Sequence, residues 1–304
     1  MADAKPLWQP GESGELLLYR VNRRPIGEGS MLPEEIPADV LDHFNRVFPN
    51  GWRVVTKGGG GNRIWRSGGV ELDREARVVT GKLGWHPAEE EAVTDYDEDA
   101  EDWVTSIEAP HGRVVLPFAF DGDTRILAVL RMGRSRAITI GGVFEKILTE
   151  NECQLMKPTT EWSVEPILDR REFNEWLESM DIVSEVEFVA KLPNPTPNDA
   201  YKDVFKRMED RRATRLIENF HSNRPTGLQN VQDDPEFRQA EAMASEGFAT
   251  LKGVGERDNR KTRYNQNEKV RRATINDLPG SWEEMRAVLT GFLKEQARGF
   301  LGDE

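Results

Sequence analysis

One turn between two apolar runs constrains the fold more than any other feature of the sequence. Arg113–Phe120 (RVVLPFAF) and Arg125–Met132 (RILAVLRM) are short, largely apolar and joined by Asp121–Thr124 (DGDT). An Asp-Gly pair between such runs is a strong hairpin signal, because it tolerates the positive φ angles of tight hairpin turns. Pro117 cannot donate a ladder hydrogen bond, so we expect an edge or a bulge there. The sequence therefore predicts an antiparallel hairpin near the middle of the chain.

Further strands are predicted where short runs rich in β-branched and aromatic residues lie between Gly, Pro and Asp. These runs are Glu15–Val21, Trp52–Lys57, Asn62–Arg66, Val70–Leu72, Arg77–Leu83, Trp162–Ile167 and Ile182–Leu192, with a pair, Phe248–Val254 and Lys269–Ile275, on either side of a basic loop. The glycine run 58–61 lies between strands and is not followed by a helix. We therefore interpret it as a hairpin tip rather than a phosphate-binding loop.

Helices are predicted where apolar residues recur at helical spacing and capping residues mark the ends. They are Pro33–Phe48, Thr139–Glu152, Glu172–Met180, a long helix from an Asn198–Asp199 cap to about Phe220, Pro235–Glu246, and Trp282–Phe300 behind the N-cap Ser281. The apolar stripe of the last helix, together with Trp176 and Leu177, is a candidate dimer surface.

The mixture of strands and helices predicts an α+β fold with mostly antiparallel sheets and flanking helices. Eight Trp and thirteen Phe can fill a core although 31% of the residues are charged. Three prolines within residues 193–197 favour a boundary between two domains. We expect an α+β domain at residues 1–192, with an N-terminal meander and an acidic loop at 86–112. A helical and β-hairpin domain with a basic loop is expected at 193–304.

Several classes of protein lack support in the sequence. There is no run of about 18 apolar residues, and the first ten residues lack the pattern of a secretory signal. The single cysteine, Cys153, lies between Glu150 and Glu152, whose negative charges disfavour a reactive thiolate. The four histidines show no metal-ligand spacing. We expect a cytoplasmic protein without a catalytic residue, a metal or a cofactor.

Charge is strongly segregated along the chain, whose net charge is −13. Residues 86–112 contain ten carboxylates and no Lys or Arg. Such a block is typical of a solvated loop or an interaction segment. A sharper hypothesis is an acidic flap that competes with DNA for a basic surface.

Basic residues gather in three other segments, and local basic surfaces can bind phosphate on an acidic molecule because distant charges are screened. The residues that we expect to contact DNA are Lys57, Arg63 and Arg66; Lys202, Lys206, Arg207, Arg211, Arg212 and Arg215; and Lys252, Arg257, Arg260, Lys261, Arg263, Lys269, Arg271 and Arg272. The second group lies on the predicted long helix, where ion pairs with neighbouring acids are an equal alternative. The third group has few acids nearby and is the better candidate.

Two other functions remain open at this point. Glu71 and Asp73 alternate on one predicted strand and Lys82 lies on a neighbouring strand, which loosely fits a metal-dependent nuclease. The second alternative is a protein-interaction module in which the acidic segment is the contact.

Residues 116–193 resemble RexA-like phage-exclusion proteins, which prophages encode. The resemblance depends on four segments: LPFAFDGDTRILAV (Leu116–Val129), GGVFEKIL (Gly141–Leu148), WSVEPIL (Trp162–Leu168) and AKLP (Ala190–Pro193). It implies a two-domain homodimer that binds double-stranded DNA without sequence preference and acts as the sensor of a phage-exclusion system. It also implies a fold similar to the RdgC class of DNA-encircling proteins, and a membrane effector of the RexB type as partner.

Overall fold

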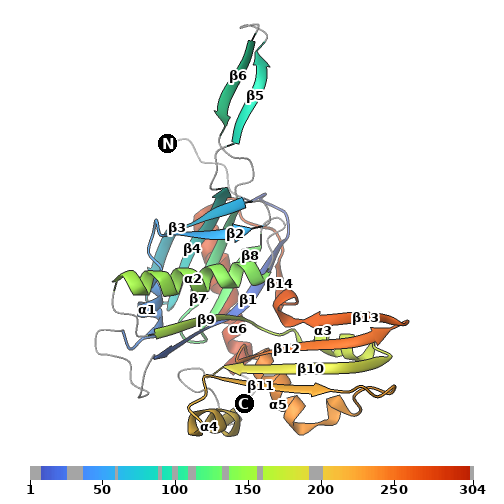
Figure 1. The fold of residues 1–304 in the computed structure, drawn as a ribbon. Coiled ribbons are helices and arrows are strands. Elements are labelled where there is room, and N and C mark those ends of the chain that lie inside the picture. Colours follow the sequence, from blue (N-terminus) through green and yellow to red (C-terminus); the bar gives the residue numbers. More distant parts are fainter. Residues whose placement is uncertain are drawn as a thin grey trace.

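The computed structural model describes residues 8–25, 37–58, 61–87, 91–97, 102–108, 114–131, 137–155, 160–191 and 201–301. The protein has the predicted α+β class, with antiparallel strands in every sheet (Figure 1). The larger sheet has eight strands, ordered β14-β1-β8-β7-β4-β3-β2, and β9 pairs with β1 off this path. These strands are β1 (Gly14–Pro25), β2 (Arg53–Gly58), β3 (Gly61–Asp73), β4 (Val78–Pro87), β7 (Val114–Asp121), β8 (Ile126–Arg131), β9 (Thr160–Pro166) and β14 (Arg272–Ile275).

The hairpin predicted from the Asp-Gly turn is confirmed as β7 and β8, in which Phe118 lies opposite Val129. The edge expected at Pro117 is wrong, because β7 lies between β8 and β4. Pairing with β8 begins at Phe118, one residue beyond the proline. The missing N–H of Pro117 therefore lies just outside that ladder.

Helices cover both faces of the large sheet (Figure 1). On one face, α1 (Val40–Val47) and α2 (Ala137–Leu155) pack in a core with Phe118 and Phe120. On the other face, α6 (Trp282–Leu301) packs against Ala119 and Ala128. The helix expected from Pro33 begins only at Val40, because the carboxylate of Asp39 caps it; residues 33–36 lie outside the described ranges.

The last helix begins as predicted behind Ser281. The Ser281 hydroxyl accepts from Glu284 N and the Glu284 carboxylate accepts from Ser281 N, each at 3.2 Å, which is a capping box. Its apolar stripe, with Met285, Leu289 and Leu293, is buried in the core. This stripe therefore supplies no free dimer face.

A smaller four-stranded sheet has the order β11-β10-β12-β13. Its strands are β10 (Ile182–Lys191), β11 (Arg215–His221), β12 (Ala249–Arg257) and β13 (Arg260–Asn265). The helices α3 (Arg170–Glu178), α4 (Lys202–Asp210) and α5 (Pro235–Ser245) share a core with one face of this sheet. Trp176 packs against that core and Leu177 belongs to it, so neither marks a dimer surface. Two 3-10 turns, η2 (Val231–Asp233) and η3 (Gln266–Glu268), complete this region.

Two predicted elements of this region are wrong. The long helix to Phe220 ends at Asp210, and Arg215–His221 is a strand that pairs with β10. The strand at Phe248–Val254 pairs with β13 instead of Lys269–Ile275, because Arg272–Ile275 joins β1 of the large sheet. The expected basic loop is thus mostly strand.

The acidic segment is also more ordered than predicted. Glu91–Asp97 (β5) and Asp102–Glu108 (β6) form a two-stranded antiparallel sheet, so the loop prediction is wrong for these residues. Figure 1 shows this hairpin projecting beyond the end of the large sheet that carries β2 and β3. The rest of the predicted loop lies partly in β4 and partly outside the described residues.

The strand pairing groups the chain differently from the division expected at residue 192. The chain leaves the large sheet after β9, builds the small sheet, and returns to the large sheet in β14 and α6. Leu168 and Val270, where the chain leaves and returns, face each other in an isolated antiparallel bridge. Among the described residues, no helix is both long and apolar enough to cross a membrane.

Candidate nucleic-acid interface

The small sheet has one covered face and one polar face, as strand alternation requires. Val186 and Phe188 of β10 point into the core that the three helices share. Glu185 and Glu187 alternate with them and therefore lie on the opposite face. We call this second surface the open face of the small sheet.

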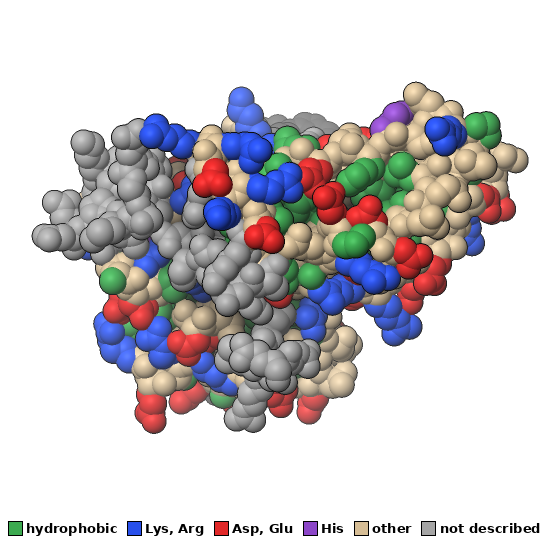
Figure 2. All heavy atoms as spheres, turned by 90° about the horizontal axis from the view of Figure 1, so that it is seen from below, with side chains coloured by type: hydrophobic (Ala, Val, Ile, Leu, Met, Phe, Trp, Pro, Cys, Tyr) green, Lys and Arg blue, Asp and Glu red, His purple; other side chains and the backbone are tan. Residues whose placement is uncertain are grey.

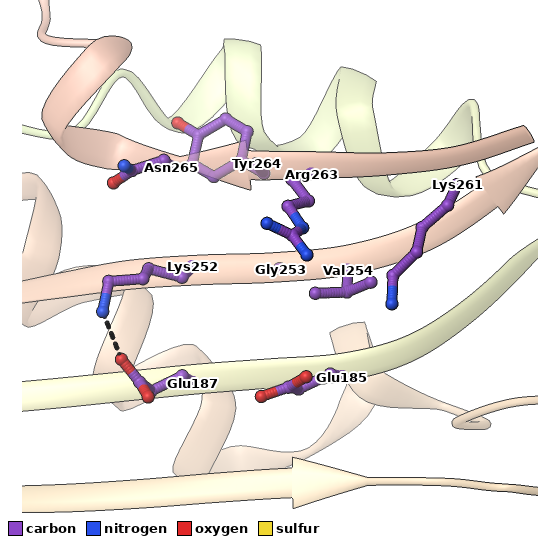
Figure 3. Close-up of a pocket in the computed structure, with 9 residues that line it drawn as sticks. All are labelled: Glu185, Glu187, Lys252, Gly253, Val254, Lys261, Arg263, Tyr264 and Asn265. Atoms are coloured by element: carbon purple, nitrogen blue, oxygen red, sulfur yellow. Dashed lines mark hydrogen bonds and ion pairs between the residues drawn. The ribbon is translucent and has the colours of Figure 1, made fainter.

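A shallow groove of about 340 Å³ lies on the open face (Figure 3). It is lined by Glu185, Glu187, Lys252, Gly253, Val254, Lys261, Arg263, Tyr264 and Asn265. Lys252 Nζ forms an ion pair with Glu187 Oε1 at 2.5 Å, and Glu185 accepts a hydrogen bond from Asn219 Nδ2 at 3.0 Å. Both acids of the groove thus already have partners.

Lys261 and Arg263 are the available cations of the groove. Both are exposed, and neither forms an ion pair with a carboxylate of the described residues. In Figure 3 both side chains extend from β13 across β12, toward Val254. Arg215 of β11 is also exposed and shares the open face. The open face therefore holds three cations with no described ion pair.

A tight turn fixes the position of these side chains. Asp258 and Asn259 have φ angles of 50° and 58°, which are the two positive values of a type I′ hairpin turn. Their turn places Arg263 opposite Val254, and the Asp181 carboxylate accepts from Asp258 N at 2.8 Å. The groove cations thus stand on a strand whose register is set.

The covered face anchors the same two strands. A Cβ on Gly253 would lie 2.4 Å from the Trp176 ring, so only glycine allows this close packing. Tyr264 lies among the buried aromatic rings, and burial raises its pKa. The floor of the groove is therefore built on a packed layer.

The predicted basic segment 252–272 is not a single surface. Arg257 and Arg260 lie opposite each other at the hairpin tip, and by alternation they project away from the open face. Lys269 pairs with Glu172 at 3.8 Å, and Arg272 pairs with Glu15 at 3.0 Å. Arg271 also has a partner, and its N–H bonds to Ile167 O. Of the basic residues expected in this segment, Lys252, Lys261 and Arg263 line the groove.

The second predicted cluster is divided between a helix, a turn and a strand. Lys206, Arg207, Arg211 and Arg212 are exposed on α4 and the turn after it. This helix packs on the covered face, away from the groove. Arg207 pairs with Glu218 at 3.0 Å, while the side chain of Lys202 lies outside the described set. The ion-pair alternative thus holds for Arg207.

The first predicted cluster is divided between the two faces of the large sheet. Lys57 and Arg66 are exposed on one face, together with Arg53. Arg63 points to the other face, where its guanidinium stacks over the Trp85 ring at 4.3 Å. Figure 2, a view from below, shows Lys and Arg in several groups with Asp and Glu between them.

Sequence reasoning missed the acids of the groove. The alternation within Ile182–Lys191 (IVSEVEFVAK) contained this signal, because it places Glu185 and Glu187 on one face and Val186 and Phe188 on the other. The position of Lys252 opposite Glu187 follows from the pairing of β10 with β12, which the sequence did not predict.

The nuclease hypothesis finds no metal site in the described ranges. Glu71 pairs with Arg286 at 2.5 Å, and the Asp73 carboxylate accepts from Ala76 N in a turn. Lys82 Nζ lies 4.4 Å from the centre of the Trp282 ring. Within the part of the chain that the structure describes, no three His, Cys, Asp or Glu residues are grouped to hold a metal ion.

The fold and the open face define an α+β protein with two antiparallel sheets, one of which presents a charged groove. The chain belongs to the family described as Domain of unknown function (DUF4747), whose profile matches residues 70–292. The matched range includes the whole small sheet and its groove, and it begins within β3. No curated protein and no solved structure matches the chain.

Proposed function

We propose that this protein binds double-stranded DNA through its phosphate backbone, without sequence preference, and that the open face of the small sheet is a contact surface. The observation that supports this most is the pair Lys261 and Arg263, exposed on one strand with no described carboxylate as partner. Two residues apart on a strand, their attachment points are separated by about 7 Å. Such cations fix a protein on the duplex but read no bases.

The acids around the groove predict weak binding. Glu187 competes for Lys252, and the molecule carries a net charge of −13. Each phosphate that is neutralised changes the slope of log K against log salt by about −0.9. With Lys252, Lys261 and Arg263 engaged, this face contributes a slope of roughly −3.

A pair of charge-reversal variants tests this surface. Lys261→Glu with Arg263→Glu changes the groove, whereas Arg257→Glu with Arg260→Glu makes the same change of net charge at the hairpin tip. We expect the first variant to weaken binding to a random duplex at least tenfold and to flatten the salt slope by about 2. The second should keep the slope of the parent. An equal loss in both variants, or no binding by the parent protein, contradicts the proposal.

The resemblance of residues 116–193 to RexA-like proteins supports a wider role. In this proposal the protein is the cytoplasmic sensor of a phage-exclusion system, acts as a homodimer with an RdgC-like fold, and signals to a membrane effector of the RexB type. Light scattering at micromolar protein tests the dimer, since a monomeric mass excludes it. The plating efficiency of phage on cells carrying the parent or the groove variant tests the pathway.

A further inference from the structure

A second cationic surface lies on β2 and β3 of the large sheet. Arg53 and Arg66 are directly opposite each other in the register, and both are exposed. Lys57 lies on the same face four residues along β2, and Val55 between them is 41% exposed. Like charges placed directly opposite on a sheet destabilise it. We call this surface the β2–β3 cation face.

The fold pairs the neighbouring arginines but not these. Arg74 binds Asp42 at 2.9 Å, and Arg77 binds both Asp39 and Asp123. Arg63 of β3 is stacked on the Trp85 ring. In contrast, Arg53, Lys57 and Arg66 form no ion pair with a carboxylate whose side chain the structure describes. An anion bound over Arg53 and Arg66 would offset this repulsion.

The backbone beneath the cation face is held in place. On the opposite face Val54 and Trp65 are buried, and Trp65 Nε1 donates to Thr56 Oγ1 at 3.0 Å. Lys146 of α2 donates to Val55 O at 2.7 Å, so this carbonyl of β2 already has a partner. The face is therefore better suited to binding through its side chains than to strand addition at Val55.

The spacing of the cations favours a polymer over a single phosphate ion. Arg53 and Arg66 have Cα atoms about 5 Å apart, so they converge on one anionic group. Lys57 is about 13 Å from Arg53 along the strand, which is too far for the same phosphate. A chain of phosphodiesters offers groups at both positions.

We infer that the β2–β3 cation face is a second phosphodiester site and that one copy of the protein bridges two duplex segments. Figure 1 places β2 and β3 at the opposite end of the body from β12 and β13. One duplex held in the groove therefore leaves the cation face free for another. This inference rests on the proposed function for the groove, but the cation face itself does not depend on it.

The test measures bridging and simple binding separately. A biotinylated duplex on beads captures a second, fluorescent duplex only if the protein holds both, while gel shift measures the binding of one duplex. Arg53→Glu with Arg66→Glu should reduce capture at least fivefold and keep more than half of the gel-shift affinity. Arg171→Glu with Arg238→Glu, at two exposed arginines elsewhere, makes the same charge change and should leave both readouts unchanged.

The outcomes separate the two proposals. If Lys261→Glu with Arg263→Glu binds as the parent does, the groove proposal fails, yet a loss of affinity in the Arg53/Arg66 variant still supports the cation face. If the Arg53/Arg66 variant bridges as well as the parent, the inference is overturned, and bridging must then come from two grooves of a dimer. Thermal unfolding by circular dichroism confirms that each variant is folded.

Discussion

The side chain of Gln266 connects the large sheet to the small sheet through hydrogen bonds to backbone groups. It is fully buried, its Nε2 donates to Pro166 O at 2.8 Å, and its Oε1 accepts from Leu251 N at 2.7 Å. These contacts connect the end of β9 to β12 of the small sheet. Unlike a packed apolar residue, this amide satisfies backbone groups that no water reaches.

Replacing Gln266 by Leu should lower the free energy of unfolding by about 2 to 3 kcal/mol, because the N–H of Leu251 loses its buried acceptor. Urea denaturation followed by Trp fluorescence measures this change. The exposed Gln229, which donates to Thr226 O, is the control, and Gln229→Ala should stay within about 0.5 kcal/mol of the parent. Equal effects of the two variants would show that the buried amide is not special.

His43 gives the fold a dependence on pH. It is fully buried, and Arg23 Nη1 donates to its Nδ1 at 3.0 Å, which requires that nitrogen to carry no proton. Burial, with the charges of Arg23 and Arg46, lowers the pKa of His43 from 6.5 to about 3. Glu152, 3.7 Å from Nε2, already accepts from Trp162. Between about pH 3 and 6.5, His43 is therefore protonated in the unfolded chain but neutral in the folded protein.

Stability should therefore fall as the pH drops from about 6.5 toward 3, with a slope from this group approaching 1.4 kcal/mol per pH unit. Urea denaturation of the parent and of His43→Gln at several pH values between 7 and 4 checks this expectation. The variant should be less stable at pH 7 but should lose stability less steeply on acidification. Parallel curves would assign the acid sensitivity to other groups.

At the scale of elements, local signals succeeded where the structure is local. The Asp-Gly turn and the Ser281 cap depend on neighbouring residues, and both predictions are confirmed. The prediction of one long helix is wrong beyond Asp210. Val204 and Met208 are helical, but Leu216–Phe220 lies in a strand that pairs with β10, and this pairing cannot be read from neighbouring residues. The cations of the groove were among the expected residues, yet no sequence pattern separated them from Arg257 and Arg260.

The acidic hairpin shows how composition can hide an element. The ten carboxylates of residues 86–112 suggested a loop, although its strands contain β-branched and aromatic residues such as Val93–Thr94 and Trp103–Thr105. The high density of charge in this segment hides the pattern that favours strands. A tethered polyanion near a basic surface has an effective concentration on the order of millimolar.

If the hairpin competes with DNA for a basic surface, replacing the acids at 89–91 and 97–99 with Gly and Ser should tighten binding to DNA and steepen its salt slope, because more cations become available to phosphate. Titration of a labelled duplex at two salt concentrations measures both quantities. If affinity and slope stay within error of the parent, the hairpin does not compete with DNA. It would then be a spacer or a contact for another partner.

For the whole molecule, a partly buried cation links the large sheet to the region of the small sheet. Arg20 of β1 donates to Glu246 O at 2.7 Å and its guanidinium lies 4.8 Å from the Phe248 ring, while burial lowers its pKa to about 10. It also donates to Thr124 O in the turn of the central hairpin. This side chain of the large sheet therefore contacts the segment between α5 and β12, whose Phe248 belongs to the core of the small sheet. No sequence pattern predicts the contacts of Arg20, because they join residues more than a hundred positions apart.

Arg20→Ala should remove roughly 3 kcal/mol of stability and separate the unfolding of the two sheets, because their shared contact is lost. Fluorescence and far-UV circular dichroism, recorded on the same urea series, should then give different midpoints. In the parent protein the two curves should coincide. A variant whose curves still coincide would show that packing alone couples the sheets.

The isolated bridge between Leu168 and Val270 has a mechanical consequence. The small sheet is attached to the large one by two stems that leave and return side by side. A module on a single linker swivels in every direction, whereas one on paired stems resists twisting and bends mainly about an axis that crosses both. If a duplex binds in the groove as proposed, a load on it is transmitted to β9 and β14 together, as a torque on the end of the large sheet that carries β14 and β1.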